Sequence, residues 1–115
     1  MAKIYYWKSS RERTCPSRDL IMGSEWLKEN CPGLLSQLQQ GKLETTHAYL
    51  TSIPDAKLES IYYNMQGEIW SPNGEARPLI EEKGLGHTSM SIGDIVELDD
   101  GSLHMVDSVG FFQLR

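Results

Sequence analysis

The last third of the chain alternates between apolar and polar residues in the manner of short β-strands. The segments "DIVEL", "SLHMVDSV" and "FFQL" are rich in β-branched and aromatic residues, which favour a half-buried pleated sheet. The stretch "DDG", residues 99–101, is typical of a tight turn between two strands. The pattern predicts an antiparallel β-meander in the carboxyl third.

Two segments nearer the amino terminus also have strand character. They are "KIYYW", residues 3–7, and "LETTHAYLTSI", residues 43–53. His47 lies in the second of them, where a single histidine is more often packed or solvated than a ligand. Aromatic residues recur in adjacent pairs, and we expect each pair to place one ring away from the core. These pairs are Tyr5/Tyr6, Tyr62/Tyr63 and Phe111/Phe112.

Between these segments, apolar residues recur at helical spacing. In residues 19–40 the pattern is interrupted by "CPG", which predicts two short helices, with Ser24 as the amino-terminal cap of the first. Residues 54–67 have the apolar spacing of one amphipathic helix. In residues 68–86 a loop leads into a further helix, for which Asn73 can act as the cap.

Together these elements predict the α+β class, as a small single domain over residues 1–115. The antiparallel meander is expected to pack with two or three short helices. The composition, 39% hydrophobic and 23% charged, is typical of globular proteins, and no apolar run approaches the roughly 20 residues that cross a bilayer. Because the first residues lack the apolar core and cleavage site of a secretory signal, we expect a cytoplasmic protein, in the host cytoplasm if it is encoded by a phage.

The net charge of −5 disfavours direct nucleic-acid binding, because clustered Lys and Arg supply most of that affinity. No membrane association is expected either. One cluster of basic residues alternates with Ser and Thr, and it is either a small anion-contacting loop or a solvated polar loop. The cluster consists of Lys8, Arg11, Arg13 and Arg18.

Metal-ligating and redox side chains are present without a recognised spacing. Cys15 and Cys31 lack the CxxC arrangement, so we expect reduced structural thiols. The histidines and nearby acids are also not spaced as a known metal motif, and we predict neither a metal nor a cofactor. These residues are His47, His87, His104, Asp94 and Asp107.

The stretch "GHTSMSIGD" places His87 beside Thr88, Ser89 and Ser91. A serine nucleophile needs a base within hydrogen-bond reach, and adjacency in sequence does not provide that geometry. The G-x-S-x-G nucleophile motif is absent. We therefore predict that these hydroxyls, and the Asp94 carboxylate, bond backbone groups where a loop enters the sheet. The loop remains a candidate contact site, without a catalytic residue.

Trp70 stands in "GEIWSPNGE", a segment expected to be a loop, together with Asn73. Exposed aromatic residues commonly anchor protein interfaces. Two roles are open for Trp70: a lid over the hydrophobic core, or a contact to a partner. Trp70 and Asn73 join His87, Thr88, Ser89 and Ser91 as candidate binding residues.

The carboxyl part of the chain resembles the YodL-like region of small proteins from bacteria, phages and plasmids. The resemblance rests on "GHTSMSIGDIV", which leads into a strand pair, and on the ending "DSVGFFQL". The preceding "IYYNMQGEIWSPNGEARPLIEEKGL" is similar to a phage and mobile-element branch of that group. The similarity spans about residues 43–114, whereas the predicted strand and helices of residues 1–42 carry none. It implies an origin, but no activity.

Three functions follow as hypotheses. The first is a non-enzymatic accessory protein of a phage or mobile element that binds a host protein or complex, for example as an inhibitor of a host enzyme or defence complex. Its acidity suits occupation of a basic surface. The second is a small-ligand or nucleotide-binding β-domain, and the third is an enzyme acting on nucleic acid or nucleotides. Homodimerisation through an edge strand or the aromatic surface is left open.

Overall fold

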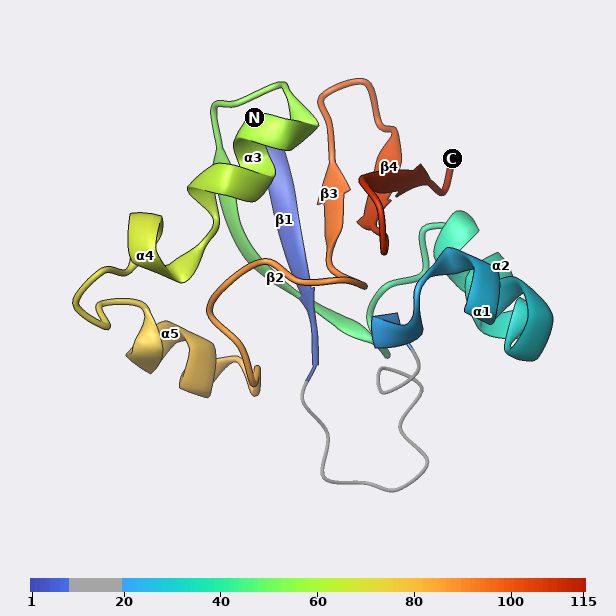
Figure 1. Ribbon diagram of the computed structural model, residues 1–115, viewed down its shortest axis with the longest axis horizontal. Helices are drawn as coiled ribbons and strands as arrows, with labels where there is room; N and C mark the ends of the chain where they lie inside the picture. Colours follow the sequence, from blue (N-terminus) through green and yellow to red (C-terminus); the bar gives the residue numbers. More distant parts are fainter. Residues whose placement is uncertain (9–19) are drawn as a thin grey trace.

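Five antiparallel strands form a sheet through the middle of the protein, in a computed structural model that describes residues 1–8 and 20–115 (Figure 1). The order across the sheet is β2-β1-β3-β4-β5. The last three strands are neighbours in chain order, which confirms the predicted meander, but β1 lies between β2 and β3, so the sheet is not confined to the carboxyl third. The strands are β1 (Ala2–Trp7), β2 (His47–Ile53), β3 (Ile95–Glu97), β4 (Leu103–Val106) and β5 (Phe111–Gln113).

Strand β1 illustrates why the sheet has a hydrophobic core on each face. Successive side chains of a strand point to opposite faces, and here Tyr6 is fully buried in one core while Tyr5 and Trp7 pack against the other. Phe111 and Phe112 are divided between the two cores in the same way. The expectation that one ring of each pair faces away from the core is wrong for these two pairs, because both faces of the sheet are covered.

Five α-helices among the described residues cover the two faces, which confirms the α+β class with more helices than expected. Helices α3, α4 and α5 supply the core that contains Tyr6, and α1 and α2 supply the core that contains Trp7 (Figure 1). None of the helices in the described part of the chain is long and apolar enough to span a membrane. The helices are α1 (Ser24–Asn30), α2 (Pro32–Gln39), α3 (Leu58–Asn64), α4 (Gly67–Trp70) and α5 (Arg77–Glu82).

Two predicted helix caps are wrong. Gly23, with φ of +90°, takes the cap position of α1, so Ser24 is the first helical residue. The backbone N–H of Ser24 donates to Asp107 Oδ1 at 3.0 Å, and an acceptor from a distant turn thus serves the helix start. Asn73 lies outside α5, and its backbone and side-chain N–H groups bond the Glu75 carboxylate instead.

Candidate functional site

The loop of residues 87–91 connects α5 to β3 and is tied to the core through its backbone. The carbonyl of Thr88 accepts hydrogen bonds from the Tyr6 hydroxyl at 2.7 Å and from Trp70 Nε1 at 3.1 Å. The N–H of Met90 donates to the carbonyl of Met65 at 3.1 Å. These bonds fix the loop between β1 and the segment from α3 to α4.

The serine hydroxyls of this loop are engaged with backbone groups. Ser89 Oγ accepts a hydrogen bond from the N–H of Gly67 at 2.7 Å, at the start of α4. Ser91 Oγ donates to the carbonyl of Ser89 at 3.0 Å. Both geometries match the backbone roles that the sequence predicts for these hydroxyls.

His87 is stacked between two aromatic rings of β1. Its ring centroid lies 4.6 Å from that of Tyr6 and 4.3 Å from that of Trp7, with interplanar angles of 11° and 25°. Its Nε2 lies 3.0 and 2.8 Å from the two carboxylate oxygens of Asp94. Among the residues that the structure describes, nothing bonds His87 Nδ1, although that atom is buried.

Asp94 is the centre of this cluster and has no exposed surface. Besides His87, its carboxylate accepts hydrogen bonds from the backbone N–H of Trp7 at 3.0 Å and of Ser91 at 2.8 Å. Burial raises the pKa of Asp94 above its ordinary value, and the bonds from His87, Ser91 and Trp7 act in the opposite direction. The carboxylate therefore joins β1, the 87–91 loop and the entry to β3.

His47 belongs to the same region and is also buried. Its Nε2 lies 2.8 Å from the carbonyl oxygen of Gly93, and its Nδ1 lies 2.7 Å from Thr46 Oγ1. Burial lowers the pKa of His47 to about 4, and nearby His87 and Lys8 add to the lowering, while the bond to Gly93 opposes it. The imidazole is therefore neutral near pH 7 and bonds two neighbours as a structural group.

The His87–Asp94 pair resembles, in geometry alone, the carboxylate–imidazole pairs that orient a general base. A nucleophile would have to reach Nδ1, and no hydroxyl in the described ranges lies within hydrogen-bond distance of it. The hydroxyls of Ser89 and Ser91 are already bonded to the backbone. The arrangement thus explains the shape of the loop and does not assemble a triad.

The remaining sequence-predicted residues are dispersed. His104 Nε2 bonds the hydroxyl of Ser102, and Asp107 bonds Ser24, so neither joins His87. Within the described part of the chain, no group of three His, Cys, Asp or Glu side chains is placed to hold a metal ion. Lys8 Nζ donates to the carbonyl of Glu44. The other predicted anion contacts, Arg11, Arg13 and Arg18, lie outside the described residues, as does Cys15.

Trp70 ends the short helix α4, where a loop was expected. It is half-buried and packs against the core of α3 to α5, and its indole N–H bonds Thr88. These contacts are those of a lid over the core. Asn73 lies on the exposed connection between α4 and α5. The structure brings Trp70 to the 87–91 loop and leaves Asn73 apart from it.

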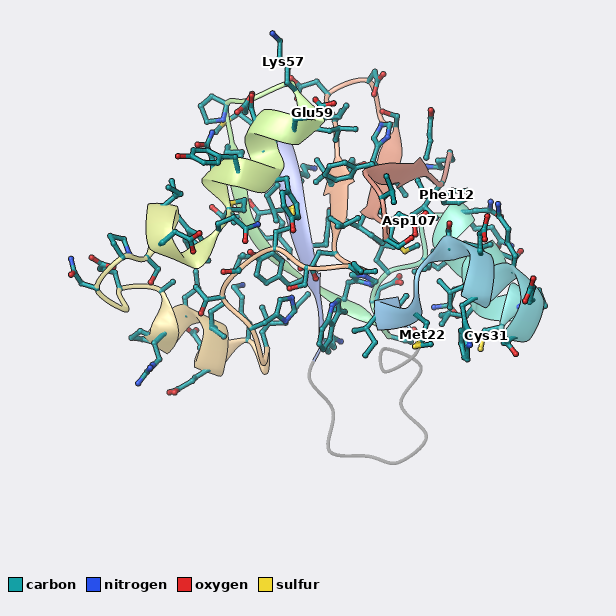
Figure 2. The ribbon with its side chains drawn as sticks, viewed as in Figure 1. Met22, Cys31, Lys57, Glu59, Asp107 and Phe112 are labelled. Atoms are coloured by element: carbon teal, nitrogen blue, oxygen red, sulfur yellow. The ribbon has the colours of Figure 1, made fainter. Side chains whose placement is uncertain are left out.

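Sequence reasoning missed a groove at the end of the sheet where β3 begins and β4 ends. Its first part, with a volume of about 480 Å³, lies between α3 and the turn of residues 107–110. Its second part, of about 390 Å³, lies between α3, Ile21 and residues 89–92. Tyr62 of α3 lines both parts. Figure 2 shows Asp107 between α3 and α1, with Met22 below it.

We call the two parts together the α3 groove. Exposed apolar side chains surround this end of the sheet. Tyr62 is 41% exposed, Ile21 49%, Met22 51% and Val109 89%. Tyr62 is held against Phe111 in an edge-on contact with ring centroids 6.5 Å apart. The sequence signal was present in the adjacent aromatic pair of α3, but the groove itself needs four segments that are distant in sequence.

Comparisons of the chain with protein-family models, with curated proteins and with solved structures gave no match.

Proposed function

We propose that this protein acts without catalysis, as a small accessory protein of a phage or mobile element that binds a host protein or complex. An inhibitor of a host enzyme or of a defence complex is the form of this function that we favour. The observation that carries the proposal is the α3 groove, whose two parts share the exposed ring of Tyr62 and whose second part is also lined by the exposed Ile21. Such patches on soluble domains mark interaction sites.

The energetics of the groove favour a macromolecular partner. A tyrosine at the centre of an interface combines a large apolar ring with a hydroxyl, and such residues commonly dominate binding energy. Tyr62 has this position because it lines both parts of the groove. Its ring is already oriented by Phe111, so less conformational freedom is lost when a partner covers it.

The His87–Asp94 cluster supports this proposal as scaffolding. Residues 89–92 form one wall of the groove, and the bonds from Ser91 to Asp94 and from Gly67 to Ser89 hold that wall in place. The resemblance to YodL-like proteins of mobile elements supports the proposed origin. The net charge of −5 supports a partner with a basic surface.

The test is capture followed by reconstitution. The full chain, immobilised through a tag, is exposed to lysates of several bacterial hosts, and a retained protein is then purified and mixed with the chain on a sizing column. We expect a complex of fixed stoichiometry that forms with the native chain and with the Tyr63→Ala variant. The Tyr62→Ala variant, which differs at the position next to Tyr63, should not form this complex. The proposal is refuted if no host yields a partner that reconstitutes.

A further inference from the structure

We infer that the α3 groove binds a basic segment of the partner, with an apolar side chain inserted between flanking Arg or Lys residues. This inference rests on the proposed function and specifies the chemistry of its site. It combines three observations: the lining of the groove, the sign of its charges and, among the described residues, the absence of Lys and Arg from that lining.

The first part of the groove is apolar at its base. Leu58 and Tyr62 of α3 lie on one side, and Val106 and Phe111 lie on the other. Val106 is buried, whereas Leu58 and Phe111 are half-buried, and all three side chains line the groove. An inserted apolar side chain would replace water against these four groups, which is the main favourable term in binding of this kind.

Two carboxylates line the same part of the groove. Glu59 projects from the exposed side of α3, and Asp107 lies opposite it at the end of β4 (Figure 2). Burial acts to raise the pKa of Asp107, but hydrogen bonds from Ser24 and Ser108 outweigh it, and the net pKa is lowered. Asp107 is therefore ionised near pH 7. Neither Lys nor Arg lines either part of the groove among the described residues.

The nearby lysines form no ion pair with these carboxylates within the described ranges. The positive charge of Lys28 attracts the Asp107 carboxylate. However, the Lys28 ammonium lies over the ring of Phe112, 4.7 Å from the ring centroid. Lys57 extends away from the body of the protein at the start of α3 (Figure 2). Ion pairs within 4.0 Å in the described ranges involve neither Glu59 nor Asp107. A basic partner segment supplies the missing counter-charges, and its apolar residue fills the space between them.

The experiment uses a fluorescein-labelled short peptide of Arg, Leu and Gly, and a matched peptide in which each Arg is replaced by Glu. Fluorescence anisotropy with the full chain measures both dissociation constants at low and at moderate salt. We expect the basic peptide to bind, with an affinity that falls as salt rises, and the acidic peptide not to bind. Equal affinity for the two peptides would overturn the inference.

Matched variants separate the groove from general acidity. Glu59→Lys and Tyr62→Ala should each lower the affinity for the basic peptide by about tenfold or more. The control variants Glu68→Lys, on α4, and Tyr63→Ala should leave that affinity within about twofold of the native value. Circular dichroism checks that each variant remains folded. If Glu68→Lys lowers the affinity for the basic peptide as much as Glu59→Lys does, attraction to the whole acidic surface explains binding, and the inference is overturned.

Two further outcomes distinguish the inference from the proposed function. A host partner that binds the Glu59→Lys and Tyr62→Ala variants as well as it binds the native chain would support the function and overturn the groove as its site. Conversely, specific peptide binding in the groove with no reconstituted host partner would support the groove and refute the function. Elution of the chain alone as a dimer that Glu59→Lys dissociates would assign the groove to a second copy, against the inference.

Discussion

Gly93 offers the sharpest test of how the 87–91 loop joins the sheet. Its φ is +98°, and a Cβ added there would lie 2.7 Å from Leu20 Cβ and 3.1 Å from both the Leu20 carbonyl oxygen and Trp7 Cδ1. The left-handed backbone costs a non-glycine residue about 1–2 kcal/mol. Overpacking against a tightly packed core costs about 1–3 kcal/mol more. Gly93→Ala should therefore lower the free energy of unfolding by about 2–5 kcal/mol.

Two other glycines separate these contributions. Gly101 has φ of +85° but no atom within 4 Å of an added Cβ, so Gly101→Ala should cost only the conformational term, about 1–2 kcal/mol. Gly33 lies in α2 with open space around it, and Gly33→Ala should stabilise the protein by about 0.4–1 kcal/mol. Urea denaturation followed by circular dichroism gives all three values. A Gly93→Ala variant no less stable than Gly101→Ala would refute the close packing of Gly93 against Leu20 and Trp7.

Two further predictions concern the buried polar groups. Burial lowers the pKa of His47 to about 4, so the unfolded chain binds a proton at higher pH than the folded protein does. Acidification from about pH 6.5 to about pH 4 should therefore lower the free energy of unfolding by about 3 kcal/mol. The urea midpoint should depend less steeply on pH in the His47→Gln variant than in the native chain. An unchanged slope would contradict the description of His47 as a buried, neutral imidazole. Asp94→Asn should cost about 2–4 kcal/mol, because an amide cannot accept all the bonds from His87 and the backbone. The surface variant Glu68→Gln should change the free energy of unfolding by no more than about 0.5 kcal/mol. A similar loss of stability in Asp94→Asn and Glu68→Gln would refute the role of Asp94 in joining β1, the 87–91 loop and the entry to β3.

Sequence reasoning captured the elements whose signals are local. The alternation in residues 94–114 predicted three strands that pair with their neighbours in the chain, and the "CPG" interruption separated two helices. The bond from the Ser91 hydroxyl to the carbonyl of Ser89 also follows from local chemistry. Such features depend on residues a few positions apart, and the sequence displays them directly.

The features that were missed depend on contacts between distant residues. The pairing of β1 with both β2 and β3 brings core to both faces of the sheet, and it is this pairing that buries Tyr6 and packs Tyr5 and Trp7. The acceptor for the start of α1 is Asp107, far along the chain from Ser24. The α3 groove likewise needs α3, Ile21, residues 89–92 and residues 106–111 to converge. No periodicity encodes which distant segments meet.

Hydrogen exchange measured on the reconstituted complex locates the surface that the partner covers and so tests whether the α3 groove is the binding surface. We expect slower amide exchange on binding in residues 58–62 and 107–111, which line the groove, and unchanged exchange in α5, residues 77–82. Protection confined to α5 or to the outer edge of β2, with none in the groove segments, would contradict it.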